Sequence, residues 1–166
     1  MTEVSDQGDT ERDGMWPITL RPIDISNWQT CIQLQLTTEQ SSKLASNLYS
    51  LAEAYVAPRC TPYGIYAGEQ MIGFVMTEWH QATATYSIPR FMIDVRWQGG
   101  GYGGRALQTI IDTLKDEQPK SSILISFTPD NTAARRLYER LGFGPQEGAT
   151  VMKLDAQGFE ELKGHA

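Results

Sequence analysis

Alternation of apolar and polar residues predicts the strands of this chain. Runs rich in β-branched and aromatic residues, bounded by Gly or Pro, have the two-residue period of a strand. They lie at residues 16–22, 63–67, 71–79, 84–95, 122–127 and 149–154. The short connection Gly68-Glu69-Gln70 predicts that the second and third runs form a hairpin. Pro89 has no N–H for a ladder, so the fourth run is expected to be bulged or partly an edge.

Apolar residues at steps of three and four predict helices between these strands. The helical stretches carry residues 28–36, 41–54, 107–114 and 134–141. Ser26 or Asn27 can cap the first helix, Pro119 stops the third, and Gly142 ends the last. The order is strand, two helices, hairpin, strand, loop, helix, strand, helix and strand, which predicts a mixed α/β domain.

Length and composition are those of one compact domain. The chain has 166 residues, of which 40% are hydrophobic, and this is enough material for a single core. Residues 1–14 hold five acids and one base and are expected to form a disordered acidic tail. Residues 156–166 are expected to form a polar C-terminal tail, which leaves residues 15–155 for the domain.

The charge and the reactive side chains exclude several classes of protein. Of the net charge of -6, -4 lies in the N-terminal tail, so binding to nucleic acid or to an anionic membrane is not expected. Cys31 and Cys60 lack the spacing of a zinc site or a disulfide scaffold, so both are predicted to be reduced and buried, with no metal. His80 and His165 leave at most one histidine for a nucleophilic pair. No apolar run approaches the ~20 residues of a membrane span, and a cytoplasmic location is expected.

A glycine cluster between a strand and a helix carries the strongest chemical signal. Five glycines occupy the six positions from Gly99 to Gly104. Such a loop exposes successive backbone N–H groups, and the following helix adds roughly half a positive charge, which suits a phosphate or a pyrophosphate. The alternative is a glycine-rich turn with no ligand, although five glycines are entropically costly for that purpose.

Two well-known phosphate loops fit this cluster poorly. A Walker A loop needs Lys-Ser/Thr after its last glycine, whereas Arg105-Ala106 follows here. Gly99, Gly101 and Gly104 satisfy the dinucleotide pattern GxGxxG, but that pattern should open a repeated βαβ sheet, and here a hairpin precedes it.

The third candidate is a resemblance to a known family. Gln98-x-x-Gly101-x-Gly103, between a strand and an amphipathic helix, resembles the acetyl-CoA pyrophosphate loop of the GNAT N-acetyltransferases. Residues 131–143 resemble the GNAT helix that ends in Tyr-x-x-x-Gly-Phe. The resemblance covers residues 18–154 and implies an α/β (α+β) fold, a mixed sheet of about six to seven strands flanked by about four helices.

A softer resemblance points to one branch of that family. Four short segments are similar to the spermine/spermidine acetyltransferases. They are residues 50–54, 62–66, 73–76 and 90–94. This branch implies a homodimer that uses acetyl-CoA as a co-substrate and acetylates a small amine such as spermidine or spermine. An antibiotic amine or a peptide N-terminus is the alternative acceptor, and a non-catalytic acyl-CoA-binding domain is the alternative to an enzyme.

The family resemblance implies roles for the cofactor-binding residues. A backbone N–H of Met92 or Ile93 would stabilise the thioester oxygen, and Ile93 and Val95 would pair with the pantetheine arm. Tyr138 would protonate the departing thiolate, since a phenol has a pKa of ~10 and a thiol a pKa of ~8.5. The full predicted cofactor set is Met92, Ile93, Val95, Gln98, Gly99, Gly100, Gly101, Tyr102, Gly103, Gly104, Arg105, Asn131, Ala134 and Tyr138.

The acceptor amine must lose a proton before it attacks, so a carboxylate should face it. Glu53 is a candidate base by resemblance to the polyamine branch, and Glu78 is a candidate because it ends a predicted strand. Solvated surface acids are the alternative reading of both. The predicted acceptor site comprises Glu53, Tyr55, Glu78, Trp79 and Tyr86. The faces of its three aromatic rings can hold cations. Pro89 stands where certain polyamine enzymes have a glutamate, so a base at that position is excluded.

Overall fold

The computed structural model describes residues 16–146 and 150–156. Within these residues seven strands form one mixed sheet in the order β1-β2-β3-β4-β5-β7-β6. The strands are β1 Ile18–Pro22, β2 Cys60–Ala67, β3 Gln70–His80, β4 Thr85–Ile93, β5 Ser122–Ser126, β6 Gly144–Pro145 and β7 Val151–Leu154. All neighbours are antiparallel except β4 and β5, which are parallel.

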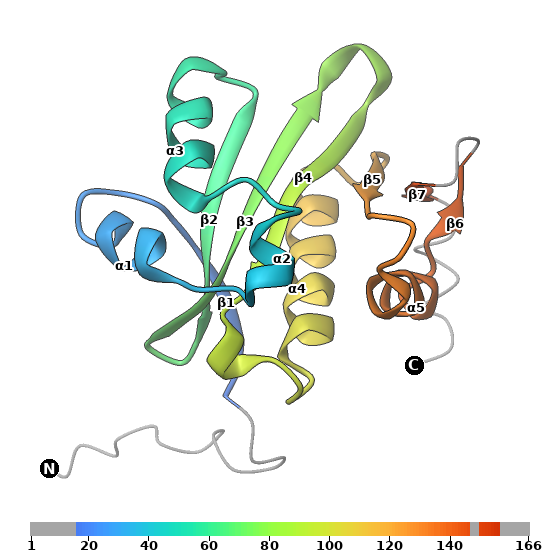
Figure 1. Cartoon of the computed structure of the whole chain (residues 1–166). Coiled ribbons are helices and arrows are strands. Elements are labelled where there is room, and N and C mark those ends of the chain that lie inside the picture. The colour runs from blue at the N-terminus through green and yellow to red at the C-terminus, as the bar shows by residue number, and fades with distance from the viewer. Residues whose placement is uncertain (1–15, 147–149, 157–166) are drawn as a thin grey trace, which may run out of the picture.

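Five α-helices cover this sheet in the described part of the chain. They are α1 Trp28–Gln33, α2 Thr38–Ser41, α3 Asn47–Val56, α4 Tyr102–Glu117 and α5 Thr132–Arg140. Figure 1 shows α1 and α3 over one face of β2 and β3, α4 along the other face, and α5 beside β5 and β7. None of the described helices is long and apolar enough to cross a membrane.

Two hydrophobic cores fill the spaces between the sheet and its helices. The larger core joins α4 to the sheet through residues such as Leu107, Ile110 and Ile125, all nearly inaccessible to solvent. The smaller core lies under α1 and α3 and includes Phe74 and Met76. Each buries a whole helix face, which is the main source of stability for helices of this length.

The pairing of β4 with β5 stops halfway along β4. Only Thr85–Ile88 of β4 pairs with β5, and Pro89 follows at once. On the other side of β4, the register with β3 shifts between Met76 and Glu78, so Ile88 and Pro89 both stand opposite Thr77. A proline has no N–H to donate, which explains why a bulge and the end of a ladder meet at this residue. Both features predicted for Pro89 are confirmed.

Most of the elements predicted from periodicity are confirmed, with changes at their ends. The hairpin forms around Gly68, both cysteines are buried and free, and Asn131 caps α5 by accepting a hydrogen bond from the Ala134 N–H. The helix predicted at 41–54 begins later, as α3 at Asn47, because the Ser46 side chain accepts the Tyr49 N–H and caps it. The short helix α2 precedes it and shares only Ser41 with the predicted range. The predicted N-terminal tail, residues 157–166 of the predicted C-terminal tail and Ala149 lie outside the described residues.

A buried carboxylate joins the segment between α1 and α2 to the end of β4. Asp94 is fully buried and accepts hydrogen bonds from the Gln35 N–H at 2.9 Å and from the Arg96 N–H and guanidinium. The Arg96 guanidinium, with help from the two backbone donors, lowers the pKa of Asp94 from 3.8 to about 2. The ionised form of Asp94 therefore stabilises this connection.

We predict that Asp94→Asn lowers the free energy of unfolding at pH 7 by about 2 kcal/mol, the value of this pKa change. Because the folded pKa is depressed, the stabilisation is present above about pH 4 and is lost as the pH falls toward about 2. Urea denaturation at pH 7, 5 and 3 should therefore show a difference from wild type that shrinks at pH 3. Asp116→Asn on the exposed side of α4 is the control. An equal difference at all three pH values would contradict this account.

Candidate active site

A cavity of about 730 Å³ lies where β4 and β5 part. Its walls come from α2 and the residues after it, from the end of β4, from the β5–α5 connection, and from α5. Tyr138 and Ala134 of α5 line one side, and Phe91 and Ile93 of β4 line the other. Two parallel strands that separate in this way leave unpaired backbone groups, so the cavity is a place for an extended ligand.

The backbone of β4 presents two residues to this cavity. The Asp94 N–H donates to the Ile72 carbonyl of β3 at 2.8 Å. In an antiparallel ladder, residues whose N–H points at the neighbouring strand alternate with residues whose N–H points away from it. Met92 therefore directs its N–H at β3, whereas Phe91 and Ile93 direct theirs at the cavity. Of the two candidates for the oxyanion N–H, the geometry favours Ile93 over Met92. It also adds Phe91, which was not predicted.

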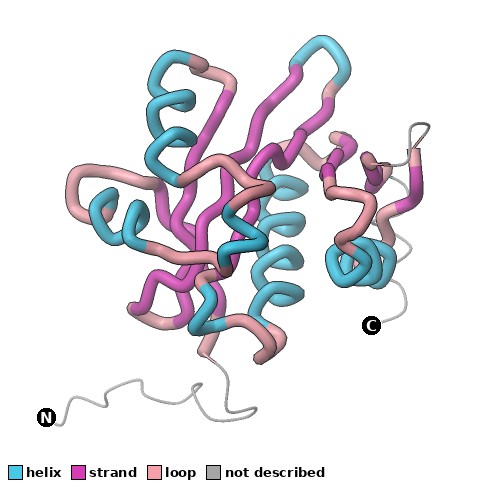
Figure 2. Tube along the Cα trace, viewed as in Figure 1, coloured by secondary structure: helices cyan, strands magenta, loops and turns pink. Residues whose placement is uncertain are grey.

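The glycine loop follows β4 after the short turn Val95–Trp97. Gly99 and Gly101 both have φ of +80°, a conformation that side chains other than glycine rarely adopt. Within the described residues, no N–H group from Gly99 to Gly104 donates a hydrogen bond. Figure 2 shows this loop running into the start of α4, whose dipole adds positive potential there. Six consecutive free donors at a helix start are an arrangement suited to bind a phosphate.

Two flanking residues of the predicted cofactor set are engaged elsewhere. The Gln98 side chain donates to the Ile93 carbonyl at 2.8 Å and exchanges hydrogen bonds of 3.0 and 3.2 Å with Gln40 of α2. The Val95 N–H donates to the Gln35 carbonyl at 2.8 Å. The structure thus pairs the Gln98 amide with α2 and the Val95 N–H with the segment before α2, while Gln98 remains in the cavity wall.

Other predicted residues do lie around the loop. Tyr102 begins α4 and packs edge-on against Trp97. Arg105, one turn into α4, has a buried Nη1 atom with no hydrogen-bond partner among the described residues. Asn131 and Ala134 stand at the start of α5 in the cavity wall. Arg105 thus carries one unpaired donor in the first turn of the helix that follows the loop.

Tyr138 lies in the cavity wall and is 6% exposed. Its ring packs between Phe127 and Phe143, with ring centroids 6.1 and 6.0 Å away. Burial raises the pKa of the Tyr138 phenol to about 12, so it stays protonated at neutral pH. Among the described residues its hydroxyl has no hydrogen-bond partner. Such a phenol can donate a proton or a hydrogen bond into the cavity but cannot serve as a base.

Glu53 projects from α3 toward β4. Its carboxylate accepts a hydrogen bond of 3.1 Å from Nη2 of Arg90, the residue next to Phe91 on β4. The Arg90 guanidinium also donates to the Pro89 carbonyl at 3.0 Å. The first predicted acid therefore stands beside the point where the strands part, already paired with an arginine.

Glu78 stands on the same face, further from the parting of the strands. Its carboxylate pairs with Arg59, accepts a hydrogen bond of 3.2 Å from the Ser87 hydroxyl, and lies 3.6 Å from His80 Nε2. The hydrogen bond from Arg59, more than any other contact, holds the pKa of Glu78 below its usual range. Both predicted acids are thus part of ion pairs.

The predicted aromatic residues are divided between the two faces of the sheet. Trp79 and Tyr86 pack on each other, with ring centroids 4.6 Å apart, in the core beneath α4, where the Tyr86 hydroxyl donates to Glu117. Tyr55 is 89% exposed on α3, the helix that also carries Glu53. Only Tyr55 of the three therefore shares a face with the two acids. The acids also contact Arg59, Ser87 and Arg90, which were not predicted. No sequence pattern indicates these contacts, because they join residues of different segments of the chain.

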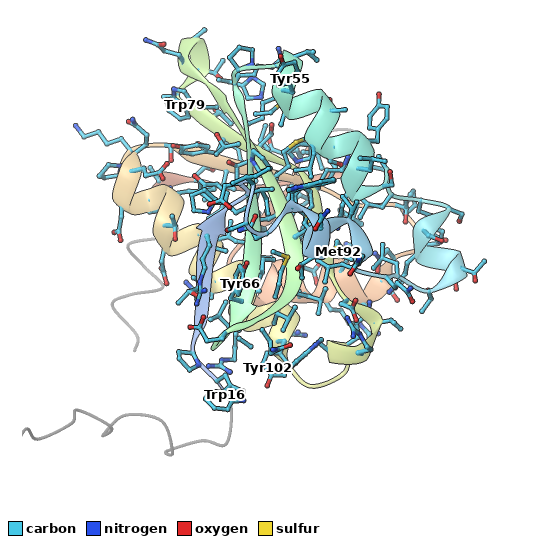
Figure 3. The ribbon with its side chains drawn as sticks, turned by 90° about the vertical axis from the view of Figure 1, so that its left-hand side faces the viewer. Trp16, Tyr55, Tyr66, Trp79, Met92 and Tyr102 are labelled. Carbon is cyan, nitrogen blue, oxygen red and sulfur yellow. The ribbon has the colours of Figure 1, made fainter. Side chains whose placement is uncertain are left out.

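Figure 3 shows how the two halves of the site are arranged along the sheet. Tyr55 and Trp79 lie at one end, Tyr102 of the glycine loop region lies at the other, and Met92 lies between them. Glu53 and Glu78 lie within two residues of Tyr55 and Trp79 in the sequence, so they belong to the end of the sheet opposite the loop. Two ligands could approach one another along β4 from opposite ends.

Comparison with known proteins identifies the family. The sequence profile of the acetyltransferase (GNAT) family matches residues 28–143, more than half of the chain. A spermine/spermidine N(1)-acetyltransferase of Bacillus subtilis is 28% identical over 132 residues, which are 76% of this chain and 87% of the relative.

Solved structures agree on the fold. Spermidine N-acetyltransferase from Vibrio cholerae, in complex with CoA and spermine, superposes with a TM-score of 0.71 at 17% identity, over 86% of this chain and 98% of that one. An aminoglycoside acetyltransferase in complex with coenzyme A gives a TM-score of 0.71 at 19% identity, over 88% and 99%. With its profile match and its parted strands, this chain belongs to the GNAT family of acetyltransferases and is an N-acetyltransferase.

Proposed function

We propose that this enzyme transfers the acetyl group of acetyl-CoA to a primary amine of a polyamine such as spermidine or spermine. The observation that carries the proposal is the cavity between β4 and β5, which is lined by Phe91, Ile93 and Tyr138. The free donors of the glycine loop follow the end of β4, and the carboxylate of Glu53 contacts Arg90 of the same strand. We include in this proposal a homodimer, a cytoplasmic location and a catalytic domain of residues 15–155.

GNAT enzymes use acetyl-CoA, and the free donors here fit its pyrophosphate and its pantetheine amides. The N–H groups of Gly99–Gly104 would hold the pyrophosphate, with Arg105 as a further donor. Phe91 and Ile93 would pair with the pantetheine arm as a neighbouring strand would. Acetyl-CoA, when bound, supplies the acetyl thioester. The Phe91 or Ile93 N–H would donate to the thioester oxygen, where negative charge develops.

The acceptor needs a group that takes up its proton and groups that hold its remaining charges. An ammonium has a pKa near 10.4, so a carboxylate or a water bound to one must accept the proton before attack. Glu53 is the nearer candidate because its partner Arg90 adjoins Phe91. Glu78, further along the sheet, would attract a second ammonium. The names of the Bacillus and Vibrio relatives support a polyamine acceptor.

We predict that Gly100→Glu abolishes acetyl-CoA binding while the domain stays folded. A Cβ at Gly100 meets only the Tyr102 ring, at 3.4 and 3.5 Å, so the change adds a negative charge to the loop without a backbone clash. Gly100→Ala, the matched control, should bind within a few-fold of wild type. Calorimetry measures both. Unchanged affinity in the folded Glu variant would remove the pyrophosphate from this loop.

We predict that Tyr138→Phe lowers kcat by about 10²–10⁴-fold if the phenol donates the proton to the departing thiolate. The KM for acetyl-CoA should hardly change, because the ring packing against Phe127 and Phe143 is kept. Steady-state kinetics with thiol detection measures both constants. A wild-type kcat in this variant would show that Tyr138 has only a packing role.

An acceptor screen tests the polyamine part of the proposal. Acetyl-CoA-dependent thiol release should be fastest with spermidine or spermine, compared with n-butylamine, an aminoglycoside and a peptide N-terminus. Glu53→Gln should raise the KM for spermidine by roughly 3- to 10-fold, less so at high salt, because one ammonium contact is lost. Glu69→Gln, which removes a carboxylate paired with Arg21 elsewhere on the sheet, is the control. Inert polyamines beside a reactive aminoglycoside or peptide would overturn the substrate but not the acetyltransferase activity.

A further inference from the structure

The two carboxylates of the acceptor site are each covered by an arginine from the chain itself. We infer that Arg59 and Arg90 are specificity-determining residues, tethered cations that occupy Glu78 and Glu53 until a polyamine displaces them. This inference rests on the proposed function and goes beyond it, because it assigns the arginines a competitive role rather than a structural one.

The inner pair lies at the parting of the strands. Arg90 contacts Glu53 through Nη2 at 3.1 Å and the Pro89 carbonyl through Nη1 at 3.0 Å. Its Nε atom is buried and has no hydrogen-bond partner among the described residues. A buried donor without a partner is unfavourable, so the guanidinium is not held in its best-satisfied position. This makes Arg90 a partner that Glu53 can exchange for an ammonium group.

The outer pair is asymmetric. The Glu78 side chain is 16% exposed and fixed by Ser87, whereas its partner Arg59 is 62% exposed. Among the described residues the Arg59 guanidinium makes no other hydrogen bond, so it closes the solvent side of a carboxylate that the sheet holds in place. Ion pairs with an exposed partner are weak and sensitive to salt. An ammonium that arrives from solvent can replace this guanidinium without disturbing Glu78.

The spacing of the two pairs suits a linear triamine. Arg90 and Ser87, which contact the inner and outer carboxylates, are three residues apart on β4 with the bulge between them, so they are separated by at most about 10 Å along the strand. A chain of three amines joined by three- and four-carbon spacers spans a comparable length. With two carboxylates and two guanidiniums, the empty site is charge-balanced. A monoamine can release only one arginine, whereas a polyamine can release both.

The decisive variant is Arg59→Gln, because Arg59 is exposed and its loss should not prevent folding. The KM for spermidine should fall by about 3- to 10-fold, since the second ammonium no longer has a competitor. The KM for n-butylamine, which reaches only the inner carboxylate, should not change. Arg21→Gln is the matched control, because Arg21 forms a two-bond ion pair with Glu69 away from this site.

Arg90→Gln should lower the KM for spermidine and for n-butylamine alike, because both need Glu53. A spermidine KM that is unchanged or higher in Arg59→Gln, while Glu78→Gln raises it, would overturn the competitor role and leave the polyamine function intact. Polyamines that are inert with the wild-type enzyme would overturn the function and this inference together. Calorimetric binding of spermidine to wild type and to Arg59→Gln separates affinity from turnover.

Discussion

The backbone hydrogen bonding between β4 and β5 ends after Ile88, and the rest of the site depends on this interruption. Proline at position 89 removes the donor that would continue the parallel ladder, and the adjacent bulge opposite Thr77 lets the strand change direction. The N–H groups of Phe91 and Ile93 are left without strand partners. These unpaired groups need other hydrogen-bond partners, and an extended ligand lying along β4 can supply them.

Periodicity alone gave the strands and the longer helices, because each of them buries one face against a core. The loop Gly99–Gly104 was also visible in the sequence, since only glycine tolerates φ near +80° and leaves the N–H groups open. The late start of α3 was missed because Ser46 looks like any polar residue of a helix until its side chain is seen to accept the Tyr49 N–H. The predictions therefore failed where a single polar contact decided the outcome.

The positions of Trp79 and Tyr86 show that a β-bulge changes which face of the sheet a side chain points to. Glu78 and Trp79 are neighbours in one strand, so they must point to opposite faces, and this could have been read from the sequence. Tyr86 is different. In a regular strand it would point to the face opposite Phe91, which is the face covered by α3. The bulge at Pro89 adds one residue and moves Tyr86 into the core beneath α4. No local sequence pattern predicts that extra residue. The arginine partners of Glu53 and Glu78 could not be predicted either, because each ion pair joins two segments that are distant in the sequence.

The reciprocal amide pair between Gln98 and Gln40 has a consequence for how the two ends of the cavity respond to solution conditions. It links the cofactor loop to α2 with neutral hydrogen bonds, which neither titrate nor weaken through ionic screening. At the acceptor end, the contacts are ion pairs between exposed or partly exposed side chains, which respond to both. Changes of ionic strength would therefore weaken the ion pairs of Glu53 and Glu78 while leaving this amide pair unaffected.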